Sequence, residues 1–183
     1  MQSLRAVSAG LDAGAVLERT AREARRLFVC DAAIVLTAAA GEPSLQPAAS
    51  DGLALGPLSG LRVALDDETS PLAAAARDLV PVTASPEAGT GDALTRELRP
   101  SSLLAVPLVV AGRLHALLVL IDLGSSGGFA PGALGRAAVF ADFAARAAEN
   151  AALFDRVDAL LAQARIRESE RAELSRRVVS AEQ

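Results

Sequence analysis

The last third of the chain contains almost nothing that would interrupt a helix. No proline follows Pro131, the last glycine is Gly135, and the residues after it are mostly Ala, Arg, Glu, Leu and Val. Most of these residues favour helix. A helix from Pro131 to Gln183 would span roughly 80 Å at about 1.5 Å per residue. A domain made from the preceding residues would be only about 35–40 Å across. We therefore expect the helix to outrun its own domain and to connect it to an output domain beyond Gln183.

Beyond residue 152, the residues of this helix recur at spacings of four and three. They are Leu153, Val157, Leu160, Ala164, Arg167, Arg171, Leu174 and Val178. This heptad pattern predicts a coiled coil that its two arginines weaken in the middle. We predict a domain over residues 1–152, a coiled-coil linker over 153–183, and a two-fold homodimer with parallel tails. Helix 1 and the exit helices would form the dimer interface.

Ahead of the exit helix, helix and strand signals alternate. Asp12 is a good N-cap for an apolar run at helical spacing, which predicts helix 1 over residues 13–28. A shorter helical turn over 3–9 is expected to precede it, with a break at Gly10. Ser70 and Pro71 open a short helix that ends near Asp78. Further strands are predicted at 32–37, 45–50, 61–65 and 80–83, the last at a sheet edge, and a helical turn at 93–98.

The strongest sheet signal comes from two apolar runs, residues 102–110 and 114–123, joined across Ala111 and Gly112. Such a connection predicts a hairpin. Because both runs are almost continuously apolar, both faces of the sheet should be covered. The predicted fold class is α+β, with an antiparallel sheet of about five to six strands and helices on both faces.

Several short segments, in this order and at this spacing, resemble a GAF domain, a sensory module of signalling proteins. The segments are residues 27–36, 101–108, 112–120, 129–131 and 147–153. Ala116 departs from the family pattern, which often has Gly there. The resemblance implies a regulatory domain without catalytic residues of its own.

The tail adds a second resemblance. Residues 171–183 look like the segment that enters the dimerisation helix of histidine kinases that pair with response regulators. This implies the GAF domain of a bacterial sensor histidine kinase in two-component signalling, cut before the catalytic core, with the kinase domain as a partner in cis. The alternatives are the effector domain of a transcription regulator, another output such as a diguanylate cyclase or phosphatase, or a methionine sulfoxide reductase.

The GAF resemblance places a small-molecule pocket between the sheet and the middle segment, roughly residues 66–102. The candidate ligand-binding residues are Thr83, Asp92, Arg96, Ser101, Ser102 and His115. His115 is expected to lie in a packed strand, with a pocket residue or haem ligand as the alternatives. Cys30 is expected to be a small buried thiol, with a redox sensor activated by Arg25 and Arg26 as the alternative.

Composition argues against several classes of function. One His and one Cys cannot supply a zinc site, and a net charge of −4 with interleaved signs disfavours nucleic-acid binding. No apolar run is long enough for a membrane span, and we expect the chain to be cytoplasmic. No cofactor is predicted. The low aromatic content disfavours haem. The resemblance disfavours cyclic nucleotides, since there is no Lys, and bilin, since no Cys lies in the middle segment.

Overall fold

A computed structural model describes residues 2–39, 41–85, 91–124 and 128–181; for residues 2–13, 152, 154–155 and 168–181 it describes the backbone alone. The chain divides into two compact units, Met1–Glu149 and Asn150–Gln183.

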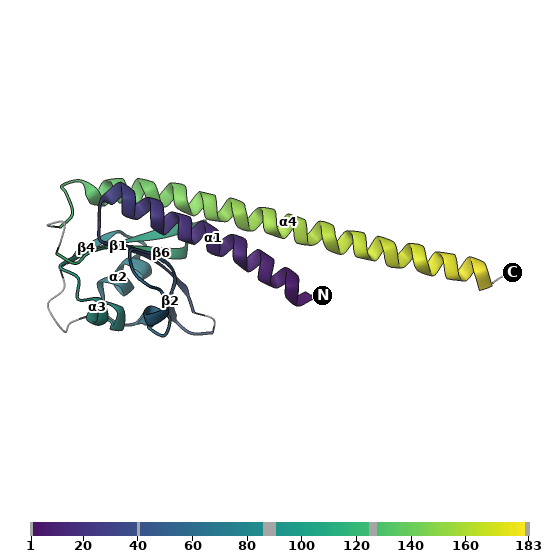
Figure 1. The fold of residues 1–183 in the computed structure, drawn as a ribbon, viewed down its shortest axis with the longest axis horizontal. Coiled ribbons are helices and arrows are strands. Elements are labelled where there is room, and N and C mark those ends of the chain that lie inside the picture. The colour runs from purple at the N-terminus through teal and green to yellow at the C-terminus, as the bar shows by residue number, and fades with distance from the viewer. Residues whose placement is uncertain (1, 40, 86–90, 125–127, 182–183) are drawn as a thin grey trace. The chain divides into compact units, whose positions relative to one another are not determined.

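The first unit is built on an antiparallel sheet with the strand order β3-β2-β1-β6-β5-β4 (Figure 1). Its strands in the described residues are β1 (Ala32–Ala38), β2 (Ser44–Asp51), β3 (Val63–Ala64), β4 (Val82–Ala84), β5 (Ser102–Val110) and β6 (Arg113–Asp122). The α+β fold with six strands confirms the prediction, and β4 lies at a sheet edge as expected. Pro81 immediately precedes β4, so it removes no donor from the ladder.

The α-helices are α1 (Gln2–Phe28), α2 (Pro71–Asp78), α3 (Ala93–Leu98) and α4 (Ala133–Ala181), with one 3-10 turn at Gly56–Leu58. The predicted break at Gly10 and start near residue 13 are wrong, because α1 runs through both Gly10 and Asp12. One glycine inside a helix costs only about 1 kcal/mol, which the helix-favouring residues on either side outweigh.

The β5–β6 hairpin forms as predicted. Ala111 and Gly112 both have positive φ, 49° and 74°, as a two-residue type I′ turn requires. The pairing then changes from Leu108 with Ala116 to Val109 with Leu114. His115 is therefore the extra residue of a β-bulge.

Apolar side chains cover both faces of the sheet. On one face Leu104, Val106 and Leu118 pack with the buried alanines of α1 and of the first turns of α4. On the other face Leu103 and Leu117 pack against Leu72 of α2 and the neighbouring elements. Figure 1 shows α1 on one side of the sheet and α2 on the other. The near-continuous apolar runs of β5 and β6 are explained by this two-sided burial.

The second unit consists of the remainder of α4. Its described large apolar side chains, including Leu153, Val157 and Leu160, are exposed in the single chain. No helix among the described residues combines the length and apolar character that a membrane span needs.

Candidate ligand site

A cleft of about 290 Å³ opens beside the N-terminus of α2, in the middle segment of the chain. Its lining, among the residues that the structure describes, comes from four places: the turn before α2, the first turn of α2 itself, the end of β4 and the entry to α3. The lining residues are Glu68, Thr69, Ser70, Pro71, Ala74, Ala84, Ser85 and Gly91. The cleft is therefore partly polar, at its rim, and partly apolar, along α2 and β4.

A buried network joins the N-termini of α2 and α3 next to this cleft. Ser70 caps α2 by accepting a hydrogen bond from the Ala73 amide at 3.0 Å, and its hydroxyl donates to Asp92 Oδ2 at 2.6 Å. Asp92 caps α3 by accepting from the Thr95 amide at 2.9 Å and from the Thr95 hydroxyl at 3.0 Å. Ser70, Asp92 and Thr95 are all buried. Because the two capping side chains, Ser70 and Asp92, are hydrogen-bonded to each other, the caps fix each other's position and one wall of the cleft is rigid.

The rim of the cleft is shaped by the turn that leads into α2. Asp67 Oδ1 accepts from the Thr69 amide at 2.9 Å and from the Thr69 hydroxyl at 2.7 Å. These hydrogen bonds, led by the one from the hydroxyl, lower the pKa of Asp67. The turn orients Glu68 and Thr69 along the edge of the cleft.

The entry to α3 contributes Gly91 to the lining of the cleft. Its φ is +86°, and a Cβ there would lie 3.2 Å from Thr95 Cγ2, so a side chain would be both strained and crowded. The Gly91 carbonyl accepts a hydrogen bond from Arg96 Nη1. This hydrogen bond fixes the segment just before α3 against the first turn of that helix.

Three of the sequence-predicted residues lie close to the cleft. Asp92 is buried behind Ser70, Arg96 holds Gly91, and Thr83 is exposed on β4 beside the lining residue Ala84. None of the three appears in the lining itself. Their part in ligand binding stays a prediction.

The other three predicted residues lie elsewhere. Ser102 alternates with Leu104 and Val106, which face α1 and α4, so its side chain points away from the cleft face. Its buried hydroxyl has no hydrogen-bond partner among the described residues. Ser101 is exposed just before β5.

His115 lies at the opposite end of the hairpin from Ser102, which pairs with Asp122. The expectation that His115 is packed in a strand is wrong, since it is exposed. The bulge displaces it from the alternation that buries Ala116 and Leu117.

Sequence reasoning missed most of the lining. The sequence indicates Ser70 only as a helix start, and it gives no sign that Glu68, Thr69 and Gly91 line a site. The available signals were the Ser-Pro pair, and an aspartate three residues ahead of Thr95 in a capping position. They predict two caps, but not that the caps contact each other.

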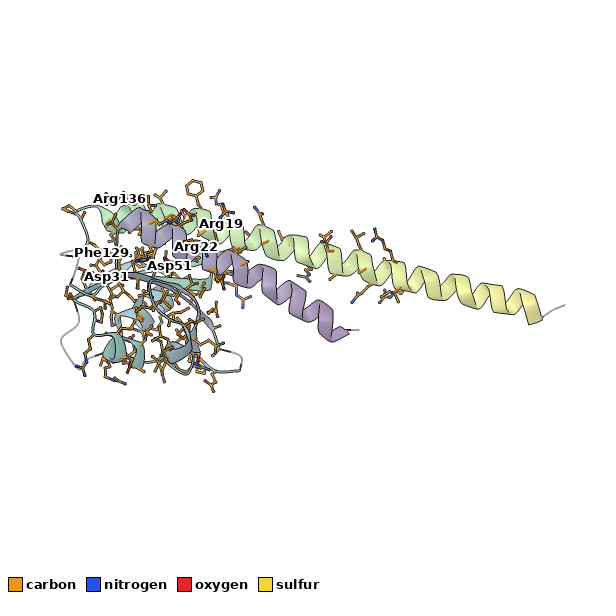
Figure 2. All side chains as sticks on the ribbon, viewed as in Figure 1. Arg19, Arg22, Asp31, Asp51, Phe129 and Arg136 are labelled. Atoms are coloured by element: carbon orange, nitrogen blue, oxygen red, sulfur yellow. The ribbon has the colours of Figure 1, made fainter. Side chains whose placement is uncertain are left out.

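A second polar cluster lies where the C-terminal part of α1 meets the start of β1 and the end of β2. Arg25 donates from Nη1 to Asp51 at 3.0 Å and from Nε to the Asp31 carbonyl at 2.9 Å. Figure 2 shows Asp31 and Asp51 beside the C-terminal part of α1. Gly52, with φ +89°, packs so closely that a Cβ would lie 2.2 Å from the Asp31 carbonyl oxygen. These contacts anchor α1 to the end of β2.

The single cysteine is not activated. Cys30 is buried, its thiol donates to the Ala32 carbonyl at 3.2 Å, and burial raises its pKa. A thiol with a raised pKa is a poor nucleophile at neutral pH, which argues against redox sensing. Among the described residues, no group of three or more His, Cys, Asp or Glu side chains could hold a metal ion.

Comparison with known proteins supports the fold. The family model of the GAF domain matches residues 12–148. The structure is similar to the second GAF domain of DevS from Mycobacterium smegmatis, with a TM-score of 0.65 and 22% identity, covering 79% of this chain and 99% of that one. No curated protein matches the chain by sequence.

Two further solved structures share the fold. A GAF domain/HD domain protein from Geobacter sulfurreducens has a TM-score of 0.65 and 20% identity, over 80% of this chain and 97% of that one. A type II free methionine-R-sulfoxide reductase from Thermoplasma acidophilum has a TM-score of 0.58 and 12% identity, over 78% and 95%. At these identities the likeness shows the fold alone.

Proposed function

Since this chain belongs to the GAF domain family, whose members are regulatory and sensory domains of signalling proteins, we propose that it binds a small molecule in the α2–β4–α3 cleft. In this proposal the domain dimerises and passes the bound state along α4 to a histidine kinase output domain in cis. The observation that carries the proposal is the cleft itself, whose wall is held by the buried Ser70–Asp92–Thr95 network.

The cleft favours a small polar ligand without a large apolar body. Its volume of about 290 Å³ is just below the range of about 300–1,000 Å³ that is typical of small-molecule sites. The Glu68 carboxylate and the hydroxyls of Thr69 and Ser85 can accept or donate hydrogen bonds, while Ala74 and Ala84 provide apolar contact. The described lining contains one acidic and no basic side chain, which favours a neutral or cationic molecule over an anionic one.

Contacts within the first unit support a relay from the cleft to α4. Ala84 lines the cleft and pairs with Leu103 of β5, and the next residue, Leu104, lies on the face covered by Ala137 and Ala141 of α4. A shift of β4 or α2 on ligand binding would therefore change the packing of β5 under α4.

The ligand proposal is tested by native mass spectrometry of the purified protein, followed by amide chemical-shift mapping with a library of small polar molecules. We expect a binder to shift the amides of Ser70, Ala74 and Gly91. Ala74→Leu should abolish these shifts by filling the cleft, whereas Ala54→Leu, at an exposed position, should leave them unchanged. Binders whose shifts lie elsewhere and survive Ala74→Leu would count against the proposed site.

The kinase output rests on the tail, whose residues 171–183 resemble the entry to a kinase dimerisation helix. The coding sequence downstream of Gln183 decides this point. A histidine in a helix rich in Arg and Glu, followed by an ATP-binding domain, is the expected result. A helix-turn-helix there would favour a transcription regulator, and a cyclase or phosphatase domain another output. Methionine sulfoxide reduction is disfavoured, because the one cysteine is buried and protonated.

A further inference from the structure

The exposed large apolar side chains of α4 are not confined to the part of the helix that forms the second unit of the chain. Val139 and Phe143 belong to the globular unit, yet they are exposed, whereas Ala137, Ala141 and Ala145 on the same helix are buried against the sheet. Val139 and Phe143 thus belong to a face of α4 that does not serve the core. Exposed aromatic and β-branched residues that lie together on a helix face indicate a surface that binds another protein chain.

Counted along the sequence, these two residues continue the heptad pattern of the tail. From Val139 the steps of four and three lead to Phe143, Arg146, Asn150, Leu153, Val157, Leu160 and Ala164 without a skipped position. The pattern therefore starts well before the boundary between the units at Glu149 and Asn150. We call this set the α4 seam.

The α4 seam has one asparagine, and its heptad position is informative. With Val157 taken as an a position, Phe143 and Asn150 are also a positions, and Leu153 and Leu160 are d positions. A single asparagine at an a position in a parallel two-stranded coiled coil pairs with the same residue of the other chain. It specifies register and strand number at a cost in stability. Asn150 is exposed in the single chain and free to make this contact.

We propose that the α4 seam binds a second copy of this chain in parallel, and that Asn150 pairs with its counterpart to fix the register and limit the assembly to two strands. This inference rests on the dimer in the proposed function and names the residue that specifies it. An asparagine at an a position is satisfied by an identical asparagine at the same height, which is why the occupant is a second copy.

The exposed area is large enough for such a pair. Six side chains on or beside the seam, Val139, Phe143, Leu153, Val157, Leu160 and Leu161, are each 51–68% exposed. Together they offer roughly 600 Å² per copy, and two copies reach about 1,200 Å², the lower bound of a stable interface. Arg146 can lie along the seam with its guanidinium in solvent.

Disulfide trapping tests the parallel arrangement. In a Cys30→Ala background, Val157→Cys places a thiol at an a position, and Asp158→Cys places one on the neighbouring, exposed b position as the matched control. Under mild oxidation we expect Val157→Cys to form at least about ten-fold more linked dimer than Asp158→Cys, because in a parallel pair the two copies of an a position face each other across the seam whereas b positions lie on the outside. Equal yields from the two variants, with a wild-type chain that is dimeric, would overturn the parallel seam.

The role of Asn150 is tested by adding Asn150→Val, with Asp158→Val as the control substitution. We expect Asn150→Val to keep self-association but to populate species larger than the dimer in sedimentation, and to lower the Val157→Cys cross-link at least about two-fold. Asp158→Val should do neither. If Asn150→Val leaves a single dimer with an unchanged cross-link, Asn150 does not specify the register although the proposed dimer stands. If the wild-type chain is a monomer, the dimer of the proposed function fails as well.

Discussion

Replacing Asp92 by alanine should destabilise the domain more than any comparable change at an exposed acidic residue. Asp92 accepts three hydrogen bonds inside the protein, from the Ser70 hydroxyl and from the amide and hydroxyl of Thr95. Losing the α3 cap costs about 1–2 kcal/mol. Leaving the buried hydroxyls without their acceptor costs about 1–2 kcal/mol more. We therefore expect Asp92→Ala to lower the free energy of unfolding by about 3 kcal/mol.

Chemical denaturation followed by circular dichroism, at one fixed protein concentration, measures this loss. Asp67→Ala is the matched control, because Asp67 accepts the same pair of bonds from Thr69 but, unlike Asp92, is not buried. A Ser70→Ala and Asp92→Ala double-mutant cycle should give a coupling of about 1–2 kcal/mol. If Asp92→Ala costs no more than Asp67→Ala, or if the cycle shows no coupling, the two caps do not form one wall and the reasoning about the cleft is refuted.

Three further predictions concern individual residues. Gly52→Ala should lower the free energy of unfolding by about 2 kcal/mol or more, because Gly52 has a positive φ and an added Cβ would lie 2.2 Å from the Asp31 carbonyl oxygen. Gly60→Ala should be near neutral, because a Cβ added there would have no atom of a more distant residue within 4 Å. Cys30 should react with iodoacetamide about ten-fold or more slowly in the folded protein than in denaturant, and a fast reaction at neutral pH would contradict its raised pKa. Asp67 has a lowered pKa in the folded protein, so its ionised form stabilises the fold above its unfolded pKa, and this contribution is lost as the pH falls through the folded pKa. Asp67→Asn should therefore make the melting temperature less sensitive to acid below about pH 4. A melting temperature that depends on pH as in the wild type would contradict this.

Much of the sheet could be predicted because its signals are local and mutually consistent. The β5 and β6 runs are apolar on both faces and meet at Ala111 and Gly112, so the hairpin and the two-sided burial follow from the same residues. The start of α1 could not be predicted in this way. Gly10 and Asp12 are local stop and start signals, and the residues around them favour one continuous helix.

The candidate site was harder to predict because it is assembled from distant segments. Ser70 and Asp92 are 22 residues apart, and only the folded chain brings the two caps to 2.6 Å. Ser102 ends the middle segment in sequence, but strand alternation places it on the face of α1 and α4. His115 stays in β6 but its side chain is exposed at a bulge, and nothing in an almost continuous apolar run indicates a bulge.

Sedimentation equilibrium of the 183-residue chain is the most direct test of the view that α4 links a sensory domain to a paired output. We predict a dimer at low micromolar concentration, weakened at least about ten-fold by Phe143→Asp and Val157→Asp together, two exposed seam positions that take no part in the core. A wild-type chain that sediments as a monomer at tens of micromolar, or a dimer that the double variant leaves intact, would contradict the account.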